Sequence, residues 1–570
     1  MLTINHSFSH ALDNNTARWT FADTQQSYSI EALGLLVDKC AAKLAAHGFQ
    51  EQDRVGLILN NSIELVGYLM ACWRLNLVAV PLRTKSGKYV NYSDFLSGCN
   101  QSCSFQLLLC DKAISNDDIA LWRTETGLNI QSEPTFDPPA LPSAPAVAVA
   151  TPQDMAIIQF SSGSTGFPKG VIVTHAMIIN QLQHIEHTHT TSRHGVSVRS
   201  SASWTPIHHD MGLFTGVLFP LFRGCNHLLA TPDYFMRNPA RWFKLLSEHQ
   251  VDLSFITNSA LVAALRTVKR LYDNEHVDLS RLHLYISAEK ISALVLRKVQ
   301  ERFAPLKLAP EHIHSAYGMA ENSLGASASK RGTLKILAVT LGADGEVRLA
   351  NETDETRIEL VSSGEANRHH VISVRDANDQ PLPDLKLGEI NIESDCLTPG
   401  YLNMPEATFA KLKDGRLRTG DLGFMHEQEL YFYSRQDDLI VIGGKNIIPE
   451  DIEETIEGFD FVRPSGSALL SIENAHTGLM ELHLVLEGDA NDTGSELARK
   501  QQTLTLAVLD IHDALLNRVH FCPKGSIEKT SSGKKRRRVI RQRLIDKQLV
   551  PFQPAATGLE PHAISHGEVT

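Results

Sequence analysis

The sequence predicts an α/β fold in which parallel strands form sheets covered by helices. Strand-like and helix-like segments alternate early in the chain, and a further apolar strand continues this alternation after residue 154. Parallel neighbours need a crossover of a dozen or more residues, which is usually a helix. At about 100–200 residues per domain, the 570 residues are enough for two to four folding units.

The first elements are predicted from hydrophobic periodicity. Residues 29–47 predict a helix, because apolar side chains recur at helical spacing and Gly48 follows as a stop signal. Residues 54–59 predict a buried strand, residues 62–75 a second helix, and residues 77–82 another apolar strand. The apolar stripe of the first helix consists of Ile30, Leu33, Val37, Cys40 and Leu44.

A proline-rich stretch over residues 136–154 interrupts this pattern. It has two interpretations, a linker between domains or a surface crossing inside one domain. The second is favoured by the apolar segment at residues 155–160, which reads as the next strand. Residues 551–570 lack periodicity and predict a frayed tail.

Composition excludes several classes of protein. With 42% hydrophobic and 21% charged residues, the chain is neither disordered nor collagen-like. The net charge of −11 argues against a dedicated nucleic-acid-binding protein. Eight cysteines without a C-x-x-C pair predict no disulfide framework and fit a reducing cytoplasm. We expect no secretory signal, because the N-terminus lacks a basic start followed by an apolar run. We expect no membrane span, because no apolar run reaches about 18 residues.

The strongest local motif is the segment FSSGSTGFPKG at residues 160–170, which directly follows a strand. Glycines let a loop turn its N–H groups toward an anion, and hydroxyl groups add further donors. A flexible Ser/Gly turn is the alternative, but the loop lies between a buried strand and Pro-Lys-Gly. We therefore predict a triphosphate-binding loop, formed by Ser161, Ser162, Gly163, Ser164, Thr165, Gly166 and Lys169.

This loop resembles the signature of the adenylate-forming superfamily, which includes acyl-CoA synthetases, amino-acid adenylation domains, luciferases and fatty acyl-AMP ligases. Further motifs follow in the family's order over most of the chain. The resemblance implies ATP and Mg²⁺ as cofactors. It also implies a large N-terminal domain of several subdomains over residues 1–436 and a small mobile α+β C-terminal domain over residues 437–550. The frayed tail predicted above, at residues 551–570, follows these two domains.

Four further motifs resemble the family's nucleotide contacts. The segment ISAEK, with a serine for the usual glycine, resembles the adenine segment, and HSAYGMAE resembles the family's Y-G-x-[TA]-E motif. RTGD and SRQDD resemble its ribose motifs, again with one serine for glycine. The resemblance implies nucleotide contacts at Ser287, Ala288, Glu289, Tyr317, Gly318, Met319, Asp421 and Arg435.

Residue chemistry agrees with these roles. Tyr317 offers a flat apolar face for adenine, and the two oxygens of Asp421 match a vicinal diol. Glu321 is a hard oxygen ligand that suits Mg²⁺. Taken singly, the residues would more simply be a half-buried tyrosine, a common turn and a surface carboxylate, and the functional interpretation is favoured only by their shared context.

Near the end of the chain, KTSSGKKRRR resembles the family's catalytic-lysine segment, with Glu528 in place of proline. The resemblance implies that Lys534 is the catalytic lysine and that Asp437 is the hinge. An ammonium group can stabilise the charge that develops as a carboxylate attacks phosphorus. A nucleic-acid patch and a solvated helix face are the alternative interpretations of this basic run.

Two features resemble the fatty acyl-AMP ligase branch. The segment HHDMGL implies that His209 lies beside the acyl carboxylate, whereas an isolated histidine is by default a satisfied core residue. The apolar run after it predicts a pocket for an alkyl chain or an ordinary core helix. Residues 328–362 resemble the branch's insertion, which restrains domain motion and disfavours free CoA; a plain β-hairpin decoration is the alternative.

The function predicted is ATP-dependent activation of a fatty acid to an acyl-adenylate, with transfer to the phosphopantetheine thiol of a carrier protein. Too few residues follow Lys547 for a fused carrier domain, so we expect a separate holo-acyl carrier protein, as in polyketide or nonribosomal peptide biosynthesis. An acyl-CoA synthetase that uses free CoA and a non-catalytic relative remain alternatives.

Overall fold

The computed structural model of the chain divides into two compact units, Met1–Asp437 and Asp438–Thr570. The residues that it describes are 3–8, 16–85, 92–133, 145–161, 168–188, 197–272, 276–329, 332–342, 344–351, 353–354, 357–442, 445–474, 477–489, 492, 494–512, 514–529 and 535–552. Each unit has its own hydrophobic core.

One sheet of the large unit contains the first predicted elements. Its strand order is β6-β5-β3-β4-β7-β8, and the neighbours are parallel except for the β7–β8 hairpin. The strands are β3 (Arg54–Ile58), β4 (Val78–Pro81), β5 (Leu107–Cys110), β6 (Ile130–Ser132), β7 (Met155–Ser161) and β8 (Lys169–Thr174). The predicted strand–helix–strand unit is confirmed, because β3 and β4 pair in parallel.

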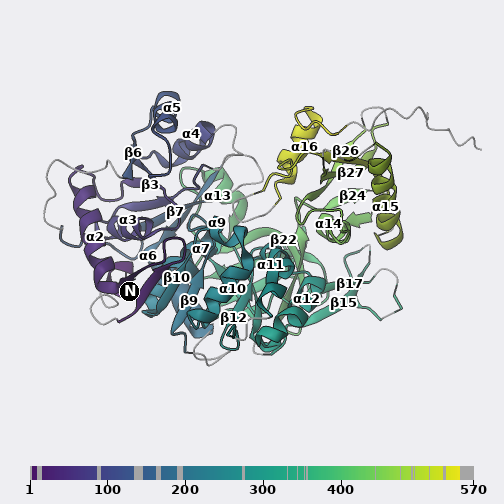
Figure 1. Ribbon diagram of the computed structural model, residues 1–570, viewed down its shortest axis with the longest axis horizontal. Coiled ribbons are helices and arrows are strands. Elements are labelled where there is room, and N and C mark those ends of the chain that lie inside the picture. The colour runs from purple at the N-terminus through teal and green to yellow at the C-terminus, as the bar shows by residue number, and fades with distance from the viewer. Residues whose placement is uncertain are drawn as a thin grey trace, which may run out of the picture. The chain divides into compact units, whose positions relative to one another are not determined.

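Helices cover this sheet, with α2 and α3 side by side (Figure 1). Helix α2 begins after Ser29, whose Oγ accepts a 3.1 Å hydrogen bond from the Ala32 backbone N–H. Such caps satisfy donors that have no partner within the helix. The predicted stripe is buried on α2. These helices are α2 (Ile30–Ala45), α3 (Ile63–Arg74), α4 (Tyr92–Cys103), α5 (Asn116–Thr126) and α6 (His175–Glu186).

The proline-rich stretch does not separate two domains. Ala79 of β4 pairs in parallel with Ile157 of β7, so the chain returns to the same sheet after this stretch. The crossing inside one domain is therefore the correct interpretation. Residues 136–144 of the stretch lie outside the described residues.

A second, larger sheet runs through the rest of the large unit in the order β19-β20-β22-β23-β18-β14-β13-β12-β11-β9-β10-β1-β2. In this sheet order, neighbouring strands from β13 through β12, β11, β9 and β10 to β1 pair in parallel. All other neighbours in the order pair antiparallel. Helices α10, α11 and α12 lie side by side over the parallel part (Figure 1). The predicted α/β class with parallel-containing sheets is thus confirmed.

The bounds of this region are as follows. The strands are β1 (Arg18–Phe21), β2 (Gln26–Ser29), β9 (Ser200–Ser203), β10 (Asn226–Leu229), β11 (Leu253–Ile256), β12 (His283–Ile286), β13 (Ile313–Gly318), β14 (Gly325–Ala328), β18 (Glu365–Ala366), β19 (His370–Arg375), β20 (Gly388–Ser394), β21 (Leu412–Lys413), β22 (Arg416–His426) and β23 (Glu429–Arg435). The helices are α7 (Asp210–Leu213), α8 (Phe219–Arg223), α9 (Pro232–Arg237), α10 (Pro239–Glu248), α11 (Asn258–Thr267), α12 (Ala293–Phe303) and α13 (Pro405–Lys411).

The predicted insertion forms a small antiparallel sheet rather than a single hairpin. Its order is β16-β15-β17, with β15 (Ile336–Leu341), β16 (Val347–Leu349) and β17 (Ile358–Val361). Arg297 of α12 donates two hydrogen bonds, of 2.6 and 2.8 Å, to the Glu359 carboxylate of β17. The small sheet is therefore fastened to the large unit.

The small unit combines strands and helices. The order β26-β27-β28 forms one sheet and β24-β25 a hairpin. The elements are β24 (Ile440–Ile442), β25 (Lys445–Ile447), α14 (Pro449–Glu457), β26 (Ser467–Glu473), β27 (Met480–Glu487), α15 (Gly494–His512), β28 (Leu516–Cys522) and α16 (Arg537–Ile545). Residues 553–570 of the predicted tail lie outside the described residues.

Candidate active site

Tyr317 lies at the end of β13, where the backbone turns sharply. A Cβ atom at Gly318 would lie 1.7 Å from the Leu324 carbonyl oxygen, so the position needs glycine. The half-buried Tyr317 donates a 2.8 Å hydrogen bond to Asp421 Oδ2. Burial, together with the Asp421 charge, raises the pKa of Tyr317 well above its usual value. The hydroxyl therefore stays a neutral donor, and the backbone of Met319 continues the same turn.

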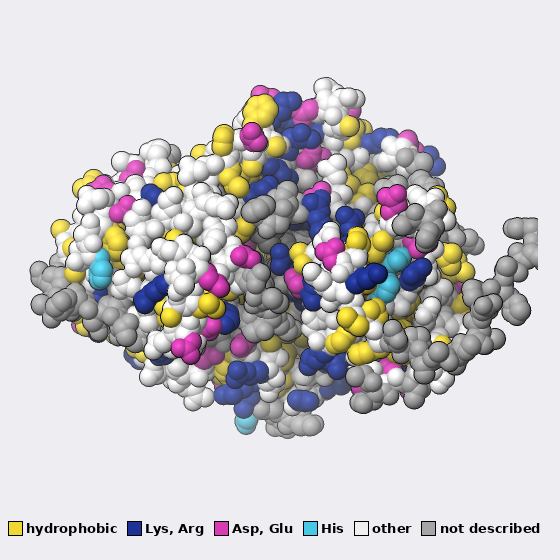
Figure 2. All heavy atoms as spheres, turned by 90° about the horizontal axis from the view of Figure 1, so that it is seen from above, with side chains coloured by type: hydrophobic (Ala, Val, Ile, Leu, Met, Phe, Trp, Pro, Cys, Tyr) yellow, Lys and Arg dark blue, Asp and Glu magenta, His cyan; other side chains and the backbone are white. Residues whose placement is uncertain are grey.

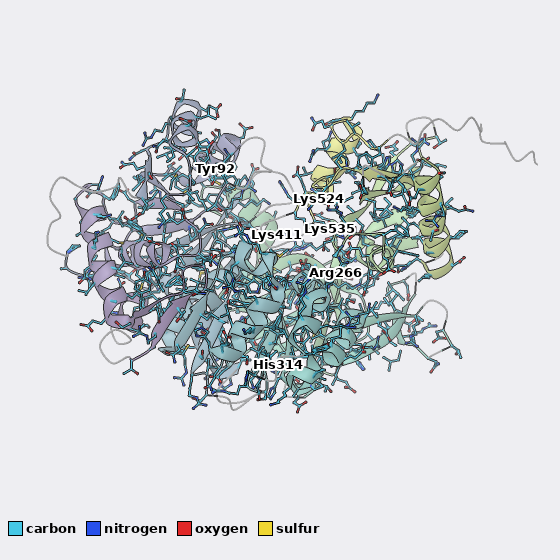
Figure 3. The ribbon with its side chains drawn as sticks, viewed as in Figure 1. Tyr92, Arg266, His314, Lys411, Lys524 and Lys535 are labelled. Atoms are coloured by element: carbon cyan, nitrogen blue, oxygen red, sulfur yellow. The ribbon has the colours of Figure 1, made fainter. Side chains whose placement is uncertain are left out.

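Asp421 and Arg435 face each other across the β22–β23 ladder, in which they are paired residues. The Arg435 Nε lies 3.2 Å from Asp421 Oδ1, and this buried oxygen accepts no hydrogen bond from the described residues. Lys411, labelled in Figure 3, donates a 2.9 Å hydrogen bond to the Thr419 carbonyl and supports the turn before Asp421. Asp421 thus keeps acceptor capacity beside a half-exposed cation.

Glu321 lies on the 3₁₀ turn Ala320–Asn322 that follows β13. Its Oε1 accepts a 2.7 Å hydrogen bond from the hydroxyl of Tyr401, and its carbonyl accepts from the Thr398 N–H. Burial and the Glu321 charge raise the pKa of Tyr401. A neutral hydroxyl thus holds one oxygen of the carboxylate.

The hairpin that carries the predicted phosphate loop is bonded to the same segment. Along β8, the Ile172 N–H donates to the Gly400 carbonyl, and the Leu402 N–H donates to the Gly170 carbonyl. Lys169 Nζ lies 5.4 Å from the centre of the Tyr401 ring. The base of the hairpin and Glu321 are therefore joined through Tyr401. Ser161 pairs with Lys169 at this base, whereas Ser162, Gly163, Ser164, Thr165 and Gly166 lie outside the described residues.

The segment Ser287-Ala288-Glu289 follows β12. The Ser287 N–H donates to the Ile256 carbonyl at 3.0 Å, and Ala288 has a positive φ of 69°. The Glu289 carboxylate accepts hydrogen bonds of 2.7 and 2.9 Å from the backbone N–H and the hydroxyl of Ser259, in the first turn of α11. The side chain of Glu289 is thus held by a helix start, where negative charge is favoured.

His209 directly precedes α7 and lies against His208, with ring centres 4.8 Å apart. The motif needs its glycine, because a Cβ at Gly212 would lie 2.0 Å from the Pro206 carbonyl oxygen. Gln159 of β7 donates a 3.4 Å hydrogen bond to the His208 carbonyl. The histidine motif is therefore tied to the strand that leads into the phosphate loop.

The apolar run after this motif lies in the main core of the large unit. Phe214, Val217, Leu218, Phe219 and Leu221 are all buried there. Residues Phe214–Leu218 form one π-helical turn between α7 and α8. Such turns are often found at functional sites. The packing agrees with the core-helix interpretation.

Lys534 lies outside the described residues, but its flanking residues are described. Lys535, labelled in Figure 3, donates to Glu453 at 2.7 Å and to Glu457 at 2.9 Å. Arg537 donates to Glu453 through two nitrogens. Much of the basic run is thus paired with carboxylates inside its own unit, and Figure 2 shows acidic and basic side chains intermixed on the face that it draws.

Comparison with known proteins identifies the family. The model of the AMP-binding enzyme family matches residues 8–402. The chain belongs to the AMP-binding enzyme family. Curated relatives include the long-chain-fatty-acid–AMP ligase FadD26 of Mycobacterium marinum, which is 28% identical over 520 residues. That match covers 85% of this chain and 86% of the relative. A putative fatty-acid–CoA ligase, fadD25 of Mycobacterium tuberculosis, is also 28% identical. That match covers 87% of this chain and 88% of the relative.

Solved structures of the family have the same fold. A structure from a study of fatty acyl-adenylate ligases from E. coli and L. pneumophila superimposes with a TM-score of 0.86 at 27% identity, covering 96% of this chain and 98% of that one. The fatty acid AMP ligase from Legionella pneumophila has a TM-score of 0.71 at 25% identity and covers 97% of both chains. The predicted superfamily is therefore confirmed. None of the helices in the described residues is both long and apolar enough to cross a bilayer.

The residues fit the ATP and Mg²⁺ that this family uses. Asp421 Oδ1 is a buried acceptor without a described hydrogen bond, as a ribose hydroxyl requires. Glu321 gives one hydrogen bond site to Tyr401, and a carboxylate has about four such sites. Capacity for a hard cation therefore remains. Sequence reasoning missed Tyr401, whose position after Pro399-Gly400 carries no motif for the nucleotide.

Proposed function

We propose that this chain is a fatty acyl-AMP ligase. A fatty acid carboxylate attacks the α-phosphorus of ATP, which gives an acyl-adenylate and releases pyrophosphate. One observation carries the proposal: hydrogen bonds connect the phosphate-loop hairpin to Glu321 through the segment around Tyr401, and Asp421 to Tyr317 on the strand that leads into Glu321. A nucleotide at this position meets its ribose, adenine and phosphate contacts together.

At the sugar end, Asp421 accepts hydrogen bonds from the ribose hydroxyls, and Arg435 contacts the ribose and phosphate. Tyr317 packs its ring on the adenine while its hydroxyl holds Asp421 in place. The backbone of Ser287, Ala288 and Glu289 lies along the adenine edge. Because the Glu289 side chain is bonded to Ser259, only its backbone is offered to the base.

At the phosphate end, residues 161–166 and Lys169 bind the triphosphate. Glu321 holds Mg²⁺, which neutralises phosphate charge when bound. The Tyr401 hydroxyl orients the Glu321 carboxylate through a hydrogen bond to one of its oxygens. His209 lies beside the acyl carboxylate, at the start of α7.

Lys534 is proposed as the catalytic lysine, whose ammonium group would stabilise the charge that develops at the α-phosphate. Asp437 is the hinge about which residues 437–550 move between the two half-reactions. Asp437 is the last residue of the large unit, which supports this assignment. Motion about it exchanges the adenylation site for a thiol-transfer site.

In the second half-reaction the acyl group passes to the phosphopantetheine thiol of a separate holo-acyl carrier protein. A cytoplasmic location is supported by the eight cysteines, which are buried free thiols. Transfer to free CoA is the second candidate, because one relative is named a putative fatty-acid–CoA ligase. The insertion sheet β16-β15-β17 is proposed to restrain the motion that CoA transfer needs.

The deciding experiment measures ATP–pyrophosphate exchange with fatty acids of increasing length, followed by addition of holo-carrier protein or CoA. We expect fatty-acid-dependent exchange, and acyl transfer to the carrier but not to CoA. Absence of exchange with every acid would support the non-catalytic alternative. Rapid acyl-CoA formation would assign the chain to the synthetases.

A deletion within residues 335–357 tests the insertion. We expect turnover with CoA to rise, because the restraint is removed. Arg297→Ala is the matched variant, since it releases the Glu359 anchor but keeps the sheet. If neither variant changes CoA turnover, the insertion has no part in thiol selection.

A further inference from the structure

Two histidines and an aspartate from distant parts of the large unit face one another. His184 lies on α6, His369 just before β19, and Asp395 just after β20. One ligand atom from each of the three lies within 4.8 Å of the other two. None of these residues belongs to the nucleotide contacts described above.

The carboxylate lies between the two rings. His184 Nε2 is 2.9 Å from Asp395 Oδ1, and His369 Nδ1 is 3.2 Å from Asp395 Oδ2. Around a tetrahedral Zn²⁺ with bonds of about 2.0–2.2 Å, donor atoms lie roughly 3.3 Å apart. The two histidine–carboxylate distances are close to this spacing, and the ligand atoms of all three residues lie within 4.8 Å of one another.

The surroundings hold the carboxylate in position. Asn180 of α6 donates a 2.9 Å hydrogen bond to the Asp395 carbonyl, so the helix carrying His184 also holds the Asp395 backbone. The His184 side chain is 4% exposed, whereas those of His369 and Asp395 are 55% and 37% exposed. One ligand is therefore fixed in the interior, and solvent reaches the other two. An ion can enter without opening the core.

We propose that His184, His369 and Asp395 form a binding site for a divalent transition-metal ion, Zn²⁺, separate from the Mg²⁺ of the nucleotide site. Two imidazole nitrogens and one carboxylate oxygen are ligands that Zn²⁺ prefers, with water in the fourth position. The ion joins α6 to the ends of two strands that lie beside it.

Arg368 controls access to this site. Its Nε donates a 3.1 Å hydrogen bond to His369 Nε2, which leaves the ring proton on Nδ1. When Nδ1 binds the ion, the proton must move to Nε2, and the Arg368 contact must break. Arg368 is exposed and can swing away. Its removal therefore favours the metal-bound form.

The site adjoins the chain that carries Glu321. Asn322 Nδ2 lies 3.0 Å from His370 Nε2, and the Ser394 hydroxyl donates to Asn322 Oδ1 at 2.5 Å. Residues 370 and 394 directly neighbour the ligands His369 and Asp395. An ion held there stiffens the backbone on both sides of the turn after Glu321.

Isothermal titration of the full, chelator-treated chain with ZnCl₂ tests the site. We expect the wild-type chain to bind one equivalent more than His369→Ala and Asp395→Asn, or to bind it at least tenfold more tightly. His249→Ala, which removes an exposed histidine elsewhere, is the control and should match the wild type. His369 is exposed, so its variant should fold, and a thermal melt checks this.

Two further variants sharpen the assignment. Arg368→Met should bind Zn²⁺ several-fold more tightly than the wild type. Glu321→Gln should keep the Zn²⁺ equivalent, which distinguishes this site from the proposed function of Glu321. Equal titrations of wild type and His369→Ala would overturn the proposal, as would loss of the equivalent in Glu321→Gln or unchanged binding in Arg368→Met.

Discussion

In the large unit, Glu321 and Asp421 each accept a hydrogen bond from a tyrosine hydroxyl, whereas in the small unit Glu453 is bonded by both Lys535 and Arg537. Glu453 is 3% exposed, and its cations are almost as deeply buried. Asp421 has one arginine nearby, but that side chain is 48% exposed. Glu321 and Asp421 therefore keep oxygen lone pairs that can accept further hydrogen bonds, whereas the Glu453 carboxylate is already occupied by its cations.

This difference separates the two carboxylates that we propose to bind ligands from a structural one. A neutral hydroxyl orients a carboxylate without cancelling its charge, so the group can still attract a cation or a diol. Two buried cations compensate the charge and tie α14 to the start of α16. Removing one partner of such a group is costly, because it leaves an uncompensated buried charge.

The largest effect is expected for Lys534→Ala. Adenylation should fall by about 10³-fold or more, because a charge aimed at the developing phosphate charge is lost. ATP–pyrophosphate exchange measures it, with unchanged circular dichroism as a check on the fold. Lys524→Ala, which changes an exposed lysine of the same unit, is the control. Exchange within tenfold of the wild type would remove Lys534 from its assigned role.

Glu453→Gln tests the structural carboxylate. We expect a loss of about 3–5 kcal/mol in the free energy of unfolding of the small unit, because Lys535 and Arg537 lose their shared anion. Denaturant unfolding measures this, with the exposed Asp510→Asn as the matched control.

The stability that Glu453 gains from Lys535 and Arg537 depends on pH in a definite direction. The pKa of Glu453 is lowered although burial opposes it, because Arg537 and Lys535 stabilise the carboxylate. Its contribution is therefore present above the unfolded pKa of about 4.3 and is lost as the pH falls through the folded value. Equal acid sensitivity of the wild type and Glu453→Gln would contradict this account.

Asp421→Asn tests the ligand-binding carboxylate at the sugar end. A hydrogen bond to a charged group is worth about 1.5–3 kcal/mol, so the KM for ATP should rise by about 10- to 100-fold while the fold stays stable. Steady-state exchange at varied ATP gives the KM. Asp414→Asn, on an exposed turn, should leave it unchanged. A large loss of stability with normal ATP binding would move Asp421 into the structural class.

The smallest effect is expected for Tyr401→Phe, which removes only the hydroxyl that orients Glu321. A neutral hydrogen bond contributes about 0.5–1.5 kcal/mol, so the Mg²⁺ concentration for half-maximal exchange should rise by at most about tenfold. Tyr28→Phe, whose hydroxyl donates to Gln26 on an exposed strand, is the control. Identical Mg²⁺ curves would show that the hydroxyl does not orient Glu321.

The sequence predicts correctly those helices and strands that are determined by local residue patterns. The β3–α3–β4 unit follows from apolar spacing and turn residues alone. The side-chain partners did not follow, because they lie far apart along the chain. Tyr401 is 80 residues from Glu321, and Ser259 is 30 residues from Glu289. No local period connects such residues, so the side-chain partners of these two glutamates could not be predicted from the sequence.

The last residues of the large unit connect the backbone around Asp421 to the chain that leads into the small unit. Arg435 is two residues before the unit boundary, and the Gln436 N–H donates to the Gly420 carbonyl beside Asp421. A shift of Asp421 would therefore act on β23 and on the turn of residues 436–438 that follows it.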